Sequence, residues 1–280
     1  MSNKVSIMEV GPRDGLQNES VFIPTALKIG FIEALLQSGL TQVEVTSFVP
    51  AKWVPQMADH EAVWAAVANQ SAANLSVLIP NMHGYQRALQ LGSLSMAFIA
   101  AASESFCQNN TACGLLDSIS RVRVLLDRAQ QDGVKNRVYL SCVFNCPYEG
   151  RIKTDTVLDL VQQLYAAGAT QISLGDTTGK ATVDDTSELL QRLTQEVPVE
   201  SLAVHFHNTA GNALANIAVA LQYGITTIDS SAAGLGGCPY SPGASGNVAT
   251  ESVIELVESL GFDSGVDVQL LRAAVQPVTD

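Results

Sequence analysis

The sequence predicts an α/β protein, and more specifically a (β/α)8 TIM barrel. Strand-like and helix-like segments alternate eight times along the 280 residues, and no linker or low-complexity segment interrupts them. Barrels of this length fold as one domain, so we expect residues 1–280 to form a single barrel domain. An open doubly wound sheet is the structural alternative.

Eight short segments with a strand-like hydrophobic pattern predict the strands. They lie at residues 4–10, 42–48, 75–80, 95–102, 137–144, 171–176, 202–207 and 226–232. Each is followed by at least one segment with helical periodicity, which is the order expected of a parallel barrel.

The helical segments lie at residues 25–39, 60–70, 84–92, 115–133, 155–168, 185–197, 212–224 and 247–261. Several end in glycine, the residue that most often follows the last turn of a helix. These helix stops are Gly39, Gly92, Gly133, Gly168, Gly224 and Gly261.

Composition excludes several classes of protein. With 47% hydrophobic and 15% charged residues, the chain can bury a large core. Its formal net charge of -12, without a long basic cluster, disfavours a surface for nucleic acid or anionic membranes. An anionic substrate would therefore have to meet a local positive group or a metal ion.

Cysteine usage and the start of the chain bear on location. The five cysteines form no C-x-x-C pair, and an odd number does not fit a closed disulfide framework, so we expect a reduced, cytoplasmic protein. The opening segment resembles no signal peptide, and no run of about 18 apolar residues predicts a membrane span.

A barrel places its active site at the carboxyl ends of its strands, and polar residues gather at these positions. The most informative are "HFHNTAGN" at 205–212 and "GPRDG" at 11–15. Residues i and i+2 of a strand point to the same face, so His205 and His207 can converge on one ion. The competing interpretation is a pair of packed or hydrogen-bonded structural histidines.

Two further residues would complete a mixed nitrogen and oxygen ligand set. Asp14 offers a carboxylate after the first strand, and Asn247 offers an amide oxygen after the eighth. Such a set suits Mg²⁺ or Mn²⁺ better than a thiolate-rich zinc site. The alternatives are an Asx-type turn for Asp14 and an N-cap for Asn247.

The segment 233–247 holds five glycines in fifteen residues and predicts a mobile loop at the active site. Cys238 lies within it, where a thiol can exchange a proton with a bound intermediate. An unremarkable surface thiol is the alternative. The glycines do not form the G-x-G-x-x-G pattern of a dinucleotide site.

Several motifs together resemble the 3-hydroxy-3-methylglutaryl-CoA lyases, within the wider family of metal-dependent barrel lyases and Claisen-type synthases. They are EVGPRDGLQNE, EVTSFVPAKWVPQMADH, CPYEG, SLGDTTG, HFHNTAGNALAN and AGLGGCPYSPGASGNVATE, and the resemblance extends from about residue 4 to 270.

The resemblance implies cleavage of 3-hydroxy-3-methylglutaryl-CoA to acetyl-CoA and acetoacetate, a retro-Claisen reaction of leucine degradation. It implies a divalent cation held by Asp14, His205, His207 and Asn247. The reaction needs a Lewis acid, a base and a positive group near the enolate oxygen. A homodimer is also an expectation from the family.

Catalytic roles follow from the same resemblance. Arg13 would stabilise the developing enolate, and Cys238 would deliver a proton to it. Asp14 and His205 are the candidate bases, and Glu44 and Thr177 are supporting rim residues.

The resemblance also guides less prominent parts of the chain. We interpret Cys142 and Cys146 as packing residues, and no motif identifies the groups that contact CoA. The chain ends in LLRAAVQPVTD, earlier than the resemblance leads us to expect, so the last barrel element is expected to be trimmed or locally loose.

Three other enzymes and a non-enzyme are alternatives. A lyase for a longer branched 3-hydroxyacyl-CoA would share the catalytic residues, and a Claisen-type synthase would join an acyl-CoA to a 2-oxo acid. Two histidines and one carboxylate also suit an Fe(II) oxygenase. A binding or scaffold protein would give the rim residues no common purpose.

Overall fold

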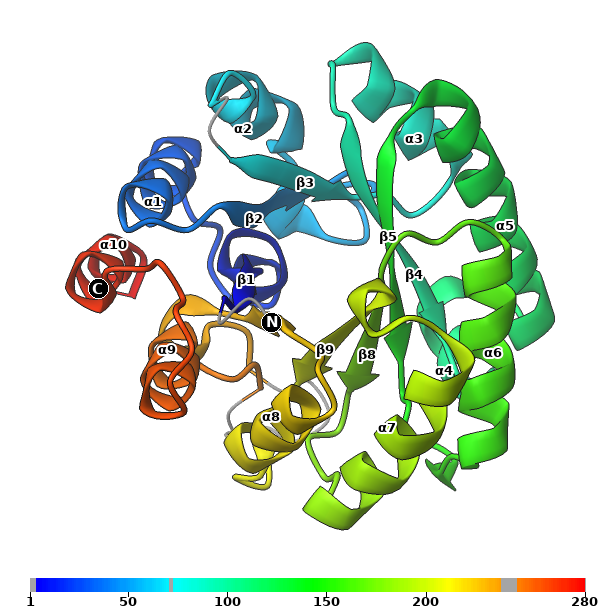
Figure 1. Cartoon of the computed structure of the whole chain (residues 1–280). Coiled ribbons are helices and arrows are strands. Elements are labelled where there is room, and N and C mark those ends of the chain that lie inside the picture. The colour runs from blue at the N-terminus through cyan, green and yellow to red at the C-terminus, as the bar shows by residue number, and fades with distance from the viewer. Residues whose placement is uncertain (1–3, 71–72, 238–245, 280) are drawn as a thin grey trace.

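The chain forms a closed barrel of eight parallel strands (Figure 1). The structure is a computed structural model, and it describes residues 4–70, 73–237 and 246–279. The barrel strands are β1 (Ser6–Glu9), β2 (Gln42–Ser47), β3 (Asn74–Leu78), β4 (Ser95–Ala101), β5 (Lys135–Ser141), β8 (Ile172–Asp176), β9 (Leu202–Phe206) and β10 (Thr227–Ser230). Around the barrel they pair in the order β1-β10-β9-β8-β5-β4-β3-β2. The predicted TIM barrel and its eight strands are confirmed, and the alternative of an open sheet is wrong.

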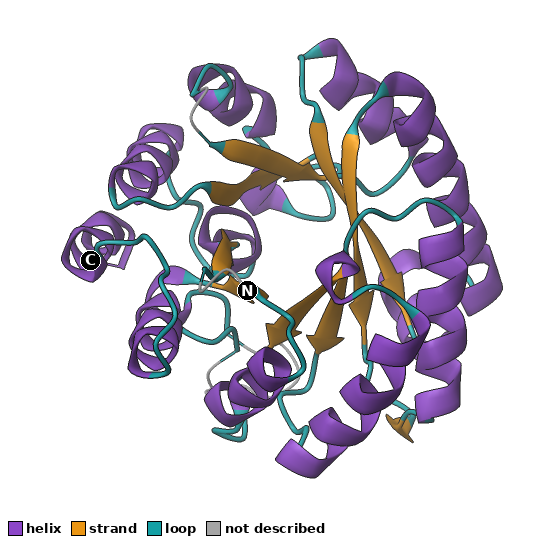
Figure 2. Ribbon diagram, viewed as in Figure 1, coloured by secondary structure: helices purple, strands orange, loops and turns teal. Residues whose placement is uncertain are grey.

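Helices surround the strands on the outside of the barrel (Figure 2). They are α1 (Thr25–Gln37), α2 (His60–Val67), α3 (Met82–Gln90), α4 (Glu104–Thr111), α5 (Leu115–Asp132), α6 (Thr154–Ala166), α7 (Val183–Glu196), α8 (Ala213–Gln222), α9 (Thr250–Ser259) and α10 (Val268–Thr279). The eight predicted helices are all present, each within a few residues of its expected bounds.

The helices form where the sequence combines an apolar face with end signals. α5 buries Ile119, Val122 and Leu126 on the face that packs against the sheet, a spacing of three and four residues. It ends at Gly133, whose φ of 67° is left-handed and favours glycine. α7 begins with a capping box in which Thr182 and Asp185 satisfy each other's backbone N–H groups.

Two helices and one hairpin were not predicted. α4 is a short polar helix between β4 and α5, and its N-cap is the side chain of Ser103, which accepts from the N–H of Phe106. A two-stranded antiparallel hairpin, β6 (Asn145–Cys146) with β7 (Gly150–Arg151), follows β5. Neither element has a long hydrophobic period to reveal it.

The second unpredicted helix is α10, which shows that the end of the chain is helical rather than locally loose as expected. α10 is a regular helix that packs against α1 beside α9 (Figure 1). Its inner face buries Leu271, Ala274, Val275 and Val278. The helix therefore lies between α1 and α9 on the outside of the molecule.

None of the helices in the described part of the chain is both long and apolar enough to cross a membrane.

The packing of α10 predicts that substitutions at two adjacent leucines have very different effects on the free energy of unfolding. Leu271 is fully buried, whereas Leu270 is 49% exposed. Leu271→Ala should lower the free energy of unfolding by about 2–5 kcal/mol, because it leaves a cavity where α10 packs against its neighbouring helices. Leu270→Ala is the matched control and should change it by less than about 1 kcal/mol. Urea denaturation measures both, and equal effects would contradict the packing of this helix.

Candidate metal centre and active site

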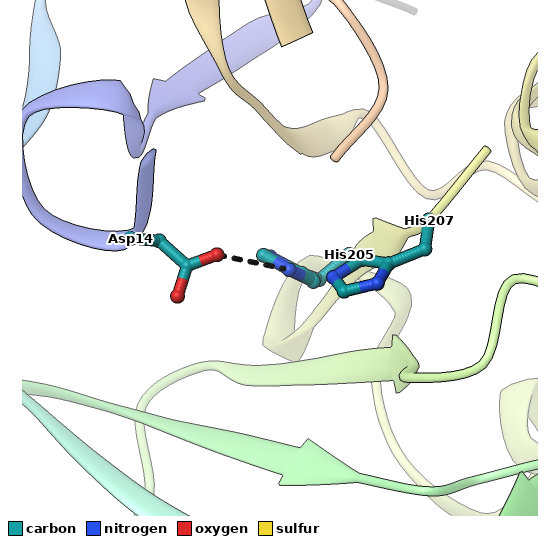
Figure 3. Close-up of side chains that lie close together, drawn as sticks. All are labelled: Asp14, His205 and His207. Atoms are coloured by element: carbon teal, nitrogen blue, oxygen red, sulfur yellow. Dashed lines mark ion pairs between the residues drawn. The ribbon is translucent and has the colours of Figure 1, made fainter. Parts of the chain in front are cut away.

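Three side chains converge at the carboxyl ends of β1 and β9. One ligand atom from each of Asp14, His205 and His207 lies within 4.8 Å of the other two (Figure 3). Nε2 of His205 is 4.0 Å from Oδ2 of Asp14, and the two imidazole ring centres are 5.4 Å apart. The sequence-predicted convergence of the H-x-H pair and Asp14 is thus present in the structure.

Asp14 is carried by a π-helical turn, Gly11–Gly15, that directly follows β1. The backbone N–H groups of Arg13, Asp14 and Gly15 all donate to the carbonyl of Val10, at 3.1, 2.7 and 3.2 Å. This turn, rather than an Asx-type turn, sets the backbone here. The Asp14 carboxylate remains available to face the barrel mouth.

Arg13 is a buried cation held between two carboxylates. Its Nη1 donates to Oδ1 of Asp14 at 2.5 Å, and its Nε donates to Oε1 of Glu44, a fully buried residue of β2. Tyr139 donates its hydroxyl to Oε2 of Glu44 at 3.0 Å, and its ring centre lies 5.3 Å from the Arg13 guanidinium carbon. These contacts fix the guanidinium beside the triad.

The electrostatics of the triad keep Asp14 ionised. Burial alone would raise the pKa of this carboxyl, but the Arg13 charge, the histidines and a hydrogen bond from Asn247 lower it to about 2. Burial, followed by the neighbouring His205, lowers the pKa of His207 to about 4. At neutral pH His207 therefore carries no charge and has a lone pair for a cation.

The residues present fit a divalent cation. Two imidazoles and one carboxylate meet within reach of one ion, and Nδ1 of His207 is buried without a hydrogen bond of normal geometry in the described part of the chain. A metal ligand satisfies such an atom. The nitrogen and oxygen donor set suits a harder cation than a thiolate site would.

Asn247 lies beside the triad but does not cap a helix. α9 begins at Thr250 with Ala249 as its N-cap, so the capping alternative is wrong. The Asn247 side chain donates through Nδ2 to Oδ2 of Asp14 at 2.8 Å and to the carbonyl of Leu235 at 3.1 Å. A rotation of the side-chain amide by about 180° would exchange its two terminal atoms and place Oδ1 where Nδ2 now lies, beside the triad.

The described ends of the glycine-rich segment are anchored at the triad. The N–H of Asn208 donates to the carbonyl of Gly246 at 2.7 Å, and Asn247 pairs with His207 in an antiparallel bridge. Gly236 has a φ of 92°, and a Cβ there would lie 2.9 Å from Nδ2 of Asn247. Glycine is thus required where this backbone meets the ligands. Cys238 lies outside the described residues.

Thr177 follows β8 and contacts the segment that follows the neighbouring strand β5. Its hydroxyl accepts from the N–H of Cys142 at 2.8 Å, where Cys142 has an unusual positive φ of 62°. Cys142 and Cys146 are both buried, and burial raises the pKa of the Cys142 thiol. The packing interpretation of these cysteines fits their environment.

Sequence reasoning missed charged residues inside the barrel strands. Arg137 on β5 and Asp229 on β10 are buried and paired, with Nη2 of Arg137 donating to Oδ1 of Asp229 at 2.8 Å. The sequence signal for each is that a charged residue lies in an otherwise apolar strand. A buried charge is seldom tolerated without a partner. Only the closed barrel reveals which partner it has.

Glu9 is another buried carboxyl that the motifs did not single out. It accepts hydrogen bonds from the N–H of Gly11, the N–H of Ala232 and the hydroxyl of Thr250, at 2.7, 2.9 and 2.6 Å. It therefore ties the π-helical turn of Asp14 to the segment that follows β10. Burial raises its pKa to about 7, although the three hydrogen bonds oppose the rise.

This raised pKa predicts a pH dependence of stability. The folded state binds the Glu9 proton more tightly than the unfolded state, whose pKa is near 4.5. The stabilisation is complete below that pH and is lost as pH rises through about 7. Between pH 5 and 8 the wild type should lose about 2–3 kcal/mol more stability than Glu9→Gln, which cannot titrate. Urea denaturation across this range measures it, and parallel pH profiles of the two proteins would contradict it.

The chain is similar to known lyases in sequence and in structure. The family model described as HMGL-like matches residues 4–278. The chain is 46% identical to the cytoplasmic 3-hydroxy-3-methylglutaryl-CoA lyase of Rattus norvegicus, covering 96% of this chain and 79% of the relative. It is 48% identical to the mitochondrial hydroxymethylglutaryl-CoA lyase of Bos taurus, covering 97% and 83%.

Solved structures agree. The crystal structure of the HMG-CoA lyase from Brucella melitensis matches with a TM-score of 0.96 at 42% identity, over 99% of this chain and 98% of that one. An HMG-CoA lyase from Acinetobacter baumannii, solved in complex with coenzyme A and 3-methylmalate, matches with a TM-score of 0.93 at 31% identity, over 99% and 92%. The family resemblance and the predicted enzyme class, a carbon–carbon lyase, are confirmed.

Proposed function

The chain belongs to the HMGL-like family, and from this premise we propose that it cleaves 3-hydroxy-3-methylglutaryl-CoA to acetyl-CoA and acetoacetate with the help of a divalent cation. The observation that carries the proposal is the Asp14, His205 and His207 triad, placed next to the buried Arg13 at the barrel mouth. The reaction needs a cation site and a fixed positive group side by side.

Asp14, His205, His207 and Asn247 would hold the cation, with Asn247 presenting its amide oxygen. Mg²⁺ or Mn²⁺ suits this set of nitrogen and oxygen donors. When bound, the ion supplies Lewis acidity that lowers the pKa of the substrate hydroxyl. The depressed pKa of Asp14 keeps its carboxylate charged in this role.

Residues of the chain would transfer the protons and stabilise the charge that develops during the reaction. Asp14 and His205 are the candidate bases, and the pKa of about 2 makes Asp14 the weaker of the two. Arg13, positioned by Glu44, would stabilise the negative charge that develops on the thioester enolate oxygen. Cys238 would donate the proton that completes acetyl-CoA.

The finer assignments belong to the same proposal. The relative solved with coenzyme A supports an acyl-CoA substrate for this chain. A place in leucine degradation is implied by the family resemblance and stays a prediction. Relatives are named both cytoplasmic and mitochondrial, so the cytoplasmic location stays a prediction, as does the homodimer.

Acetoacetate release tests the proposal directly. The purified protein, stripped with EDTA, should release acetoacetate from 3-hydroxy-3-methylglutaryl-CoA only after Mg²⁺ or Mn²⁺ is added. His207→Ala should need a higher metal concentration for half-maximal activity, by at least roughly tenfold, because one ligand is lost. His83→Ala, at an exposed histidine of α3, is the matched control.

Two outcomes would overturn the proposal. Absence of release with any metal would favour a lyase for a longer branched 3-hydroxyacyl-CoA or a Claisen-type synthase, each tested with its own substrate. Oxygen consumption with Fe(II), and no reaction with Mg²⁺, would instead favour an oxygenase.

The role of Arg13 predicts an effect on turnover rather than on substrate binding. Arg13→Met should lower kcat by roughly 10²-fold or more, equivalent to about 3 kcal/mol in the barrier, with a much smaller change in KM. Arg87→Met removes a half-exposed arginine paired with Glu61 and should change neither constant. A rise in KM with unchanged kcat would place Arg13 in substrate recognition instead.

A further inference from the structure

Asp229 lies behind His205, on the side away from the cation site. β10 and β9 are parallel neighbours, and their register places Asp229 directly beside His205. Oδ2 of Asp229 is 3.4 Å from Nδ1 of His205, within hydrogen-bond distance although the two atoms do not meet in normal hydrogen-bond geometry. Nε2 of His205 is 4.0 Å from Oδ2 of Asp14. The two nitrogens of one ring thus face two different carboxylates.

The Asp229 carboxylate is held in place from two further strands. Nη2 of Arg137, on β5, donates to its Oδ1 at 2.8 Å, and the hydroxyl of Ser173, on β8, donates to its Oδ2 at 2.6 Å. The Asp229 side chain is fully buried. A carboxylate anchored in this way can only accept a hydrogen bond from His205, because it has no proton to donate.

The ring of His205 has little freedom to turn away. Tyr139 packs its ring against that of His205 in an edge-on arrangement, with 5.8 Å between the ring centres. The Arg137 guanidinium carbon lies 4.9 Å from the centre of the same tyrosine ring. Asp229 and Tyr139 therefore contact the inner side of His205, and Arg137 contacts both of them.

We propose that Asp229 is a positioning residue that holds His205 in the tautomer with its proton on Nδ1, leaving the Nε2 lone pair directed to the cation site. This inference rests on the metal site of the proposed function. A carboxylate behind a metal-binding histidine fixes the tautomer and ring orientation and makes the ring a better ligand.

The competing role for Asp229 is purely structural, as the counter-ion of the buried Arg137. The substitution Asp229→Asn separates the two roles. The buried Arg137 needs an acceptor, so the asparagine oxygen should remain with Arg137 and its Nδ2 should face His205. An N–H donor at that place favours a lone pair on Nδ1 and moves the His205 proton to Nε2.

The first experiment measures the tautomer without metal or substrate. Long-range ¹H–¹⁵N correlation spectra of the metal-free protein, labelled at its four histidines, report which ring nitrogen carries the proton. His205→Gln assigns the His205 signals by their absence. We expect a protonated Nδ1 in the wild type and a protonated Nε2 in Asp229→Asn. A protonated Nε2 in the wild type would overturn the proposal, whether or not the variant folds.

The second experiment measures metal affinity through the electron paramagnetic resonance signal of free Mn²⁺. Asp229→Asn should weaken Mn²⁺ binding by roughly 10–100-fold. Asp155→Asn, the same chemical change at an exposed carboxylate paired with Arg192, is the matched control and should stay within about threefold of the wild type. Unchanged affinity in Asp229→Asn would contradict the positioning role. Neither measurement needs 3-hydroxy-3-methylglutaryl-CoA, so failure of the lyase proposal would remain distinguishable.

Discussion

The buried charge of Arg13 is the constraint on which the candidate site depends. A guanidinium taken out of water needs charged partners, and breaking such a buried pair typically costs about 3–5 kcal/mol. Here Asp14 comes from the same turn and Glu44 from the next strand of the barrel, and Tyr139 holds the other oxygen of Glu44. The contacts that the Arg13 guanidinium needs therefore connect three parts of the rim.

This arrangement also explains how a carboxylate can remain charged while poorly accessible. Burial opposes ionisation of Asp14, but Arg13 and the other partners more than compensate, and its pKa falls to about 2. Glu9 has the same chemistry without a nearby cation, and its pKa rises to about 7. Two carboxyl groups five residues apart thus have opposite shifts because only one of them has a guanidinium beside it.

Hydrophobic periodicity predicted the barrel well because each strand and most helices carry their own pattern. The alternation of apolar residues located all eight strands, and the H-x-H spacing alone was enough to place His205 and His207 on one face. Both are local properties of the chain. They need no knowledge of what lies opposite in space.

What the sequence concealed depends on distant partners. Arg137 and Asp229 are 92 positions apart, and their pairing exists only because the barrel is closed. The N-cap alternative for Asn247 came from the helical pattern that follows it, yet the helix begins at Thr250. α10 lacked a prediction because the family resemblance, rather than the amphipathic pattern of the segment, guided the expectation for the end of the chain.

Given an acyl-CoA substrate, the charges of the site give a second reason for a cation. Three buried or half-buried carboxylates, from Asp14, Glu44 and Asp229, meet only two guanidiniums, from Arg13 and Arg137. One negative charge is left over where an anionic acyl-CoA would have to bind. A divalent cation reverses that sign, and a mouth that would repel the substrate becomes one that attracts it. In a chain with a net charge of -12, the barrel mouth needs such a local reversal.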